Sequence, residues 1–190
     1  MTRGFPGEVV FFPRQPRNND SMSRIQGFPP VATASAHTLI LGSMPGAASL
    51  RAGQYYAHPR NAFWPIVSEL LGVTAGASYA ARTRALKSAG VALWDVLQSC
   101  ERQGSLDARI QPQSGTVNDF RQFLRTHRRV TRIYFNGSTA EIIFRRQVLP
   151  MLDDDCAVLT RLPSTSPAHA ALSFAEKLQA WRVILPPESQ

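Results

Sequence analysis

The sequence predicts an α/β fold, a single three-layer domain with a central, mostly parallel four-stranded sheet flanked by helices. Three observations support this prediction. Four short apolar segments have the character of buried strands, helical patterns separate them, and 190 residues suffice for one domain with a substantial core. Strands that alternate with helices are typical of a parallel sheet that is covered on both faces.

The first half of the chain contains two of the expected strands and two helices. Residues 38–41 form a short apolar run that ends in a Gly/Pro turn, as expected of a buried strand. The helix expected over residues 62–71 repeats apolar residues at helical spacing and stops at Gly72. A second helix, residues 79–88, stops before another glycine, and the strand expected over residues 91–93 follows it.

The second half repeats this alternation. The helix expected over residues 118–126 carries its phenylalanines on one side, and the apolar run 132–135 is the third strand. An Asn-Gly turn starts the helix 138–149, which ends at a proline, and residues 157–159 form the fourth strand. The last helix, residues 173–184, stops before a Pro-Pro pair. Because ligands bind at the carboxyl ends of parallel strands, the segments that follow these strands are expected to converge.

Composition limits the classes of function. Residues 1–26 are expected to form a mobile extension, because they are rich in Pro, Arg, Asn and Ser, a composition that continues to about residue 36. No apolar run reaches membrane-spanning length and no signal peptide is evident, so we expect a cytoplasmic protein without membrane contact. Cys100 and Cys156 lie far apart and no CxxC occurs, which predicts neither a metal site nor any other cofactor.

The charge points to a polyanionic partner. The formal net charge is +8, and the basic residues are nineteen Arg and two Lys. Arginine suits phosphate recognition through its planar fork. The basic clusters are Arg121, Arg125, Arg128, Arg129 and Arg132, and Arg145 with Arg146. Alternatively, these clusters are ordinary solvated helix faces.

The segment from residue 39 to residue 64 carries the densest chemistry, in the sequence LILGSMPGAASLRAGQYYAHPRNAFW. A strand and a Gly/Pro turn lead into a loop with two Tyr, a His, an Arg and an Asn within eight residues. Such a concentration of polar and aromatic side chains is unusual for a purely structural connection.

This segment resembles the first motif of the uracil-DNA glycosylase superfamily, and specifically its hypoxanthine-DNA (deoxyinosine) glycosylase branch. The second superfamily motif would be LPSTSPAH at residues 162–169, and the stretches ALWDVL at 92–97 and FNG at 135–137 also look like that branch. The resemblance implies a uracil-DNA glycosylase-like fold for residues 27–190. It implies a monomeric enzyme of base excision repair that hydrolyses the N-glycosidic bond of deaminated bases, preferably hypoxanthine, in double-stranded DNA.

Asn61 is the residue that the resemblance assigns to catalysis, since it ends the HPRN sequence of that branch. Its carbonyl oxygen would orient a water molecule near the sugar. The alternative is that Asn61 caps the following helix, because Asn is a favoured N-cap residue.

Two residues depart from the uracil-specific relatives. Met44 stands where those enzymes have an Asp or Asn, and Leu162 stands where they have a His or Asn. Neither side chain can orient a water or donate a hydrogen bond. Strong activity on uracil is therefore not expected, and Met44 should pack under the base or line the pocket.

The remaining candidate residues fall into two groups. The base pocket is expected to contain Gly42, Ser43, Met44, Pro45, Gly46, Tyr55, Tyr56, Phe63, Trp94 and Asn136. DNA contacts are expected from His58, Arg60, Ser164, Thr165, Ser166 and His169. Several alternatives stay open: Phe63 has the spacing of a core residue, Asn136 could form an ordinary turn, His169 could be a surface residue, and the serine loop could cap the last helix. Asp95 could either orient a partner or cap a turn.

Other functions compete with this interpretation. Only Lys87 and Lys177 could form a Schiff base, and both lie outside the motifs, so a glycosylase that leaves an abasic site is expected. The alternatives are a mismatch uracil or xanthine glycosylase, a non-catalytic nucleic-acid-binding module with the same fold, and a hydrolase of free nucleosides.

Overall fold

A computed structural model of the chain describes residues 24–101, 115–152 and 157–185. Its centre is a four-stranded sheet in which all neighbouring strands are parallel, in the order β3-β2-β6-β7. The strands are β2 (Thr38–Gly42), β3 (Val91–Asp95), β6 (Arg132–Asn136) and β7 (Val158–Leu162). Every residue of β2 and β3 is buried. The predicted α/β class and the four predicted strands are confirmed.

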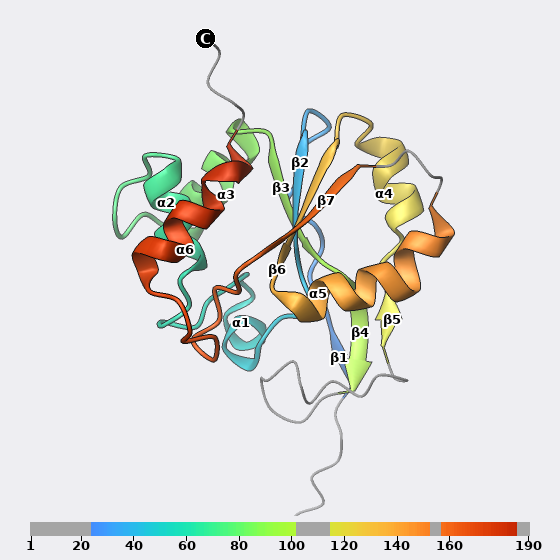
Figure 1. The fold of residues 1–190 in the computed structure, drawn as a ribbon, viewed down its shortest axis with the longest axis horizontal. Helices are drawn as coiled ribbons and strands as arrows, with labels where there is room; N and C mark the ends of the chain where they lie inside the picture. The colour runs from blue at the N-terminus through green and yellow to red at the C-terminus, as the bar shows by residue number, and fades with distance from the viewer. Residues whose placement is uncertain (1–23, 102–114, 153–156, 186–190) are drawn as a thin grey trace, which may run out of the picture.

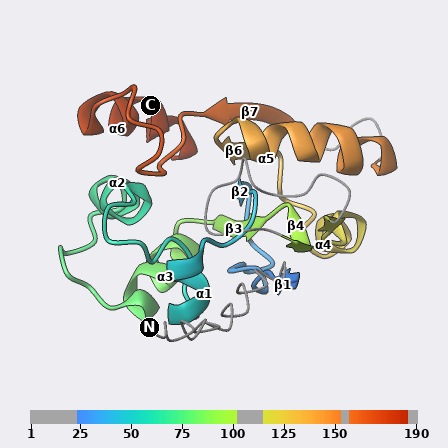
Figure 2. The same cartoon turned by 90° about the horizontal axis from the view of Figure 1, so that it is seen from below.

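Helices cover both faces of this sheet, which makes the domain three-layered. Figure 1 shows α2, α3 and α6 on one side of the strands and α4 and α5 on the other. In Figure 2 the strands again lie between α2 and α3 on one side and α4 on the other. The bounds of these helices are α2 (Phe63–Leu70), α3 (Tyr79–Ser88), α4 (Phe120–Thr126), α5 (Ser138–Ile143) and α6 (Phe174–Trp181).

Capping side chains set several helix starts. The Asp119 side chain accepts a hydrogen bond from the Gln122 N–H at 2.9 Å, so α4 begins later than expected, at Phe120. Ser173 and Glu176 form a reciprocal capping box at the start of α6.

The helix expected over residues 138–149 is instead α5 followed by a π-helical turn, Phe144–Val148, and a 3₁₀ turn, Leu149–Met151. The last helix likewise ends in a 3₁₀ turn, Arg182–Ile184.

Two parts of the fold were not predicted. Helix α1 (Ala47–Ala52) lies within the segment expected to be a loop, and a second sheet of antiparallel strands has the order β1-β4-β5. Its strands are β1 (Arg24–Gln26), β4 (Leu97–Glu101) and β5 (Thr116–Val117). Because β1 pairs with β4, the expectation of a mobile extension is wrong for residues 24–26, while residues 1–23 and Cys156 lie outside the described residues.

Residues 27–36 also belong to the folded domain, although their composition resembles that of the expected mobile extension. Val31 forms a β-bridge with Leu93, and its N–H donates to the Leu93 carbonyl at 2.9 Å. Ala36 is almost completely buried. The start of the domain is therefore fixed to the edge strand β3.

Large aromatic side chains fill the layers on both faces of the sheet. The fully buried ones are Phe63, Phe120, Phe135, Phe144 and Trp181. The Phe144 ring lies 5.2 Å from both the Phe120 ring and the Phe135 ring, which joins the π-helical turn to α4 and β6. Within the described ranges, no helix has the length and apolar content needed to cross a bilayer.

Replacing Phe144 by Ala should remove this junction and lower the free energy of unfolding by about 3–5 kcal/mol, as buried Phe-to-Ala changes do. Urea denaturation measures the change. Ile142→Ala is the matched control, because Ile142 is 49% exposed on the neighbouring helical turn and should cost no more than about 0.5 kcal/mol. Equal losses in the two variants would contradict the packing of Phe144 against α4 and β6.

Candidate active site

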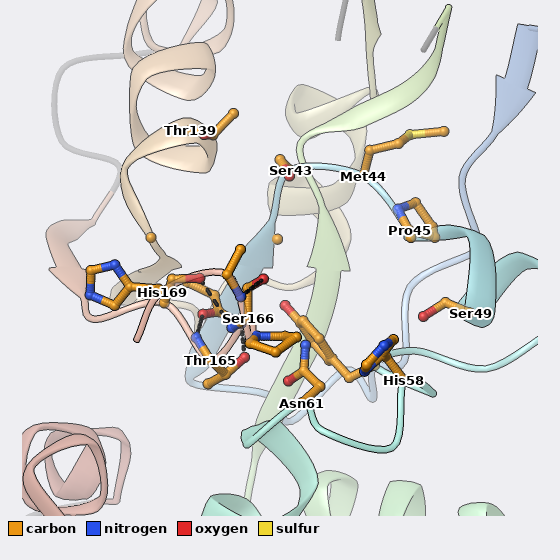
Figure 3. A pocket seen from close by; sticks show the side chains of 18 of the residues that line it. Ser43, Met44, Pro45, Ser49, His58, Asn61, Thr139, Thr165, Ser166 and His169 are labelled. Carbon is orange, nitrogen blue, oxygen red and sulfur yellow. Dashed lines mark hydrogen bonds between the residues drawn. The ribbon is translucent and has the colours of Figure 1, made fainter. Parts of the chain in front are cut away.

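A cavity of about 730 Å³ opens at the carboxyl edge of the four-stranded sheet. Gly42, Asp95 and Asn136 are the last residues of β2, β3 and β6, and all three line it. The loop after β7 completes the wall, and Figure 3 shows its residues facing His58 and Asn61 across the hollow. The predicted convergence of the motifs at this edge is therefore observed.

Most of the candidate residues named from the sequence line this cavity. They are Gly42, Ser43, Met44, Pro45, Gly46, Tyr55, Tyr56, His58, Arg60, Asn61, Asn136, Ser164, Thr165, Ser166 and His169. Phe63 and Trp94 do not, so their assignment to the pocket is wrong. Lining residues that the sequence analysis left unassigned include Ser49, Asp95, Ser138 and Thr139.

The floor of the cavity depends on a close approach to Gly42. Gly42 pairs in register with Asp95. A Cβ atom at Gly42 would overlap the Asp95 carboxylate and would lie 2.9 Å from the Tyr56 hydroxyl oxygen. Glycine is therefore the residue that lets these two polar groups meet the end of β2.

Asp95 brings a buried carboxylate to the cavity wall. Only 3% of the residue is exposed, and Asn118 Nδ2 donates to its backbone carbonyl at 2.8 Å, which fixes the end of β3. The signal that could have singled it out was its place directly after a buried strand on the carboxyl edge. Among the described residues, no group of three or more His, Cys, Asp or Glu is arranged to hold a metal ion.

Tyr56 forms the aromatic wall. Its ring stacks on that of Phe63, with centroids 4.0 Å apart and an interplanar angle of 22°. Its φ of 53° lies in the left-handed region, which a tyrosine adopts only where its surroundings enforce it. Phe63 is completely buried behind Tyr56, so it supports the wall from the core, as its helical spacing suggested.

Tyr55 and Trp94 are both held by the segment that precedes β2. The Tyr55 hydroxyl donates to the carbonyls of Phe28 and Pro29 at 3.3 and 3.2 Å, and the residue is 3% exposed. Burial raises the pKa of Tyr55 well above its ordinary value, and the charge of Asp95 adds to this shift, so the hydroxyl remains a donor. Trp94 Nε1 donates to the same Phe28 carbonyl at 3.0 Å.

Asn61 lines the cavity and also holds the start of α2. Its Oδ1 accepts the Phe63 N–H at 2.9 Å, and its own N–H donates to the His58 carbonyl at 2.9 Å. The cap-like hydrogen bond that was the alternative interpretation is thus present. It also fixes the amide, which lies at the cavity with one Oδ1 lone pair and both Nδ2 hydrogens not used by this bond (Figure 3).

The loop after β7 is built around Thr165, which is completely buried. Thr165 donates its N–H to Asn136 Oδ1, and its Oγ1 accepts from Asn136 Nδ2, both at 2.8 Å. The expectation that the Thr165 side chain contacts DNA is therefore wrong, because the side chain is buried. Ser166 and His169 are more accessible and remain at the rim. The cap of α6 is Ser173, not the serine loop.

Met44 and Leu162 occupy apolar surroundings. Met44 lines the cavity, as predicted, and packs with Leu97 and Cys100 in a small cluster near the second sheet. Figure 3 shows its side chain turned away from His58 and Asn61. Leu162, the last residue of β7, is 4% exposed and belongs to the main core.

Arginines lie at both edges of the sheet. Arg60 lies at the cavity, whereas Arg128, Arg129 and Arg132 lie where β6 begins, at the opposite edge. These three members of the large arginine cluster named from the sequence are therefore remote from the cavity.

The fold and the cavity together define an α/β domain with a ligand-sized cavity, lined by polar side chains, at the carboxyl edge of a parallel sheet. Comparison with known families is specific: the model of the uracil DNA glycosylase superfamily matches residues 29–185. The chain belongs to the uracil DNA glycosylase superfamily. It is a DNA glycosylase, an enzyme that hydrolyses the bond between a base and its deoxyribose, and its substrate is DNA.

Individual relatives agree with this assignment. The chain is 37% identical over 113 residues to the hypoxanthine DNA glycosylase of Methanosarcina barkeri, which covers 59% of this chain and 70% of the relative. The chain is 35% identical over 116 residues to the hypoxanthine DNA glycosylase of Methanosarcina acetivorans. This match covers 60% of this chain and 72% of the relative. The solution NMR structure of a candidate uracil DNA glycosylase from Methanosarcina acetivorans superposes with a TM-score of 0.69 at 30% identity, over 85% of this chain and 99% of that one.

The close approach at Gly42 can be tested by replacing it with Ala. The added methyl group should displace the Asp95 carboxylate and the Tyr56 hydroxyl, and excision of a damaged base from DNA should slow by about tenfold or more. Single-turnover kinetics measures the rate, and thermal unfolding shows whether the fold is kept. A folded variant with the parent's rate would contradict the proposed floor of the cavity.

Proposed function

We propose that this protein removes hypoxanthine from deoxyinosine in double-stranded DNA and leaves an abasic site, as the first step of base excision repair. The relatives that carry the name hypoxanthine DNA glycosylase support this substrate. The observation that carries the proposal is a single cavity that combines a buried carboxylate, an aromatic wall and an oriented amide.

The carboxylate of Asp95 supplies a reason for selecting a deaminated purine. Hypoxanthine presents a lactam N1–H, a donor that a carboxylate can accept, whereas adenine presents a bare N1 acceptor at the same place. A buried acceptor that repels adenine protects the normal base. Tyr56, backed by Phe63, offers a flat face on which a flipped base stacks.

Uracil, xanthine, guanine and thymine also carry a lactam or imide N–H, so Asp95 by itself distinguishes hypoxanthine from adenine, and uracil from cytosine, and does not choose among the bases that carry this donor. The apolar residues Met44 and Leu162 argue against uracil, because neither can replace the polar groups of the uracil-specific relatives. A mismatch uracil or xanthine glycosylase is thus the second candidate.

Asn61 is proposed as the catalytic residue. Its amide is fixed by the Phe63 N–H and faces the cavity. When the N9–C1′ bond breaks, its electron pair leaves with the base and positive charge develops on the sugar. A water held by the Asn61 amide then adds to C1′, and its proton is lost to solvent. Holding that water in line is a positioning effect, which needs a fixed group rather than a strong base.

The rim of the cavity is proposed to hold the DNA strand. His58, Arg60, Ser164, Ser166 and His169 lie there, and they offer hydroxyl, imidazole, guanidinium and backbone N–H groups to phosphates. A monomeric state and a cytoplasmic location remain predictions from the sequence.

Hydrolysis without strand cleavage fits the placement of Lys177. Its side chain is buried, and Nζ donates to the His169 carbonyl at 2.7 Å. Lys177 is not among the residues that line the cavity. We therefore propose that the enzyme is monofunctional.

Asn61→Ser separates catalysis from the hydrogen bond at the start of α2, because a serine hydroxyl can accept the Phe63 N–H in the same kind of turn but lacks the amide. We expect Asn61→Ser to unfold at the parent's temperature and to lose about 100-fold or more in single-turnover excision of hypoxanthine. Asn61→Ala should lose the same activity and also some stability. Full activity in the folded Ser variant would leave Asn61 with a capping role alone.

The substrate itself is tested on matched duplexes that contain deoxyinosine, deoxyuridine or deoxyxanthosine, with alkali to cleave abasic sites. We expect hypoxanthine to be released fastest. Faster release of uracil would favour the second candidate, and DNA binding without release of any base would indicate a binding module.

A further inference from the structure

We infer that Thr165 is a positioning residue for base excision: held by the amide of Asn136, it holds the start of α2 and thereby the Asn61 amide at the cavity. The inference rests on the proposed role of Asn61. It assigns to a buried threonine a part in the chemistry, although the side chain itself reaches neither the base nor the DNA.

The first half of this connection joins the end of β6 to the loop that follows β7. Asn136, at the end of β6, uses both atoms of its amide on Thr165: Nδ2 donates to Oγ1, and Oδ1 accepts the backbone N–H, each at 2.8 Å. Paired hydrogen bonds of this kind fix both distance and orientation, and Thr165 is completely buried. Asn136 therefore positions the loop after β7, in addition to lining the cavity.

The second half joins the loop to α2. The Ala62 N–H donates to the Thr165 carbonyl at 3.0 Å. Ala62 is the N-cap residue of α2 and lies between Asn61 and Phe63, so its N–H is one of the donors that a helix start cannot satisfy internally. A shift of Thr165 consequently moves the backbone that carries Asn61.

The body of α2 is held independently of Thr165. Phe63, Ile66 and Val67 are fully or almost fully buried, and Trp64 Nε1 donates to the Tyr55 carbonyl at 2.7 Å. Loss of the Thr165 contacts should therefore leave the helix in place and disturb its first residues. This predicts a loss of rate with little loss of stability.

Thr165→Val tests the connection, because it keeps the shape and the backbone groups but removes the hydroxyl that Asn136 binds. We expect single-turnover release of hypoxanthine at saturating enzyme to slow roughly tenfold, with unchanged gel-shift affinity for the duplex. The melting temperature should fall by only a few degrees, the cost of leaving Asn136 Nδ2 without its partner. Thr165→Ser restores the hydroxyl and should return the rate to within about twofold of the parent. The matched control is Thr83→Val on α3, which should keep the parent's rate.

A double-mutant cycle with Asn61→Ser identifies the route of the effect. If Thr165 acts through Asn61, Thr165→Val should cause no further loss in the Asn61→Ser background. An equal fractional loss in both backgrounds, or a loss of duplex affinity at an unchanged rate, would overturn the inference. Full activity of Asn61→Ser alone would instead refute the proposed role of Asn61, and the inference with it.

Discussion

The alignment of strand ends at one edge of the parallel sheet is the constraint on which the site depends. Register pairs Gly42 with Asp95 and Asn136 with Leu162, so four distant parts of the chain end at the same level. The loops that follow these strands therefore lie side by side at this edge. The glycine at the end of β2 then decides how closely the carboxylate can approach, and the resulting cavity brings together residues more than 100 positions apart in the sequence.

Polar groups in this site are fixed chiefly by hydrogen bonds to backbone atoms. The Asn61 amide is held by a helix N–H, the start of α2 by the carbonyl of Thr165, and Tyr55 by two carbonyls of the segment before β2. Such bonds orient a neutral amide without requiring a charged partner. They suit a mechanism in which the enzyme positions water and base and the leaving group carries the charge. The apolar Met44 and Leu162 lie outside this network, in two separate clusters of the core.

The sequence predicted the large elements and the location of the site, but not the direction of every side chain. Strands and helices with several apolar residues were found because burial imposes a period, and α3 was predicted with its observed bounds. The strands β1 and β5 have three and two residues, too short to show a period. Trp94 and Thr165 were misassigned because a motif gives the neighbourhood of a residue and not its orientation. The role of Asp95 depends on its contact with Gly42, a close approach between strands that spacing along one chain cannot reveal.

The most direct test of the account is a crystal structure of the Asn61→Ser variant bound to a duplex with one deoxyinosine. The account predicts an intact deoxyinosine flipped into the cavity, with its base against Tyr56, its N1–H on the Asp95 carboxylate, and C1′ facing residue 61. A base bound outside the cavity, or one whose lactam edge points away from Asp95, would contradict it.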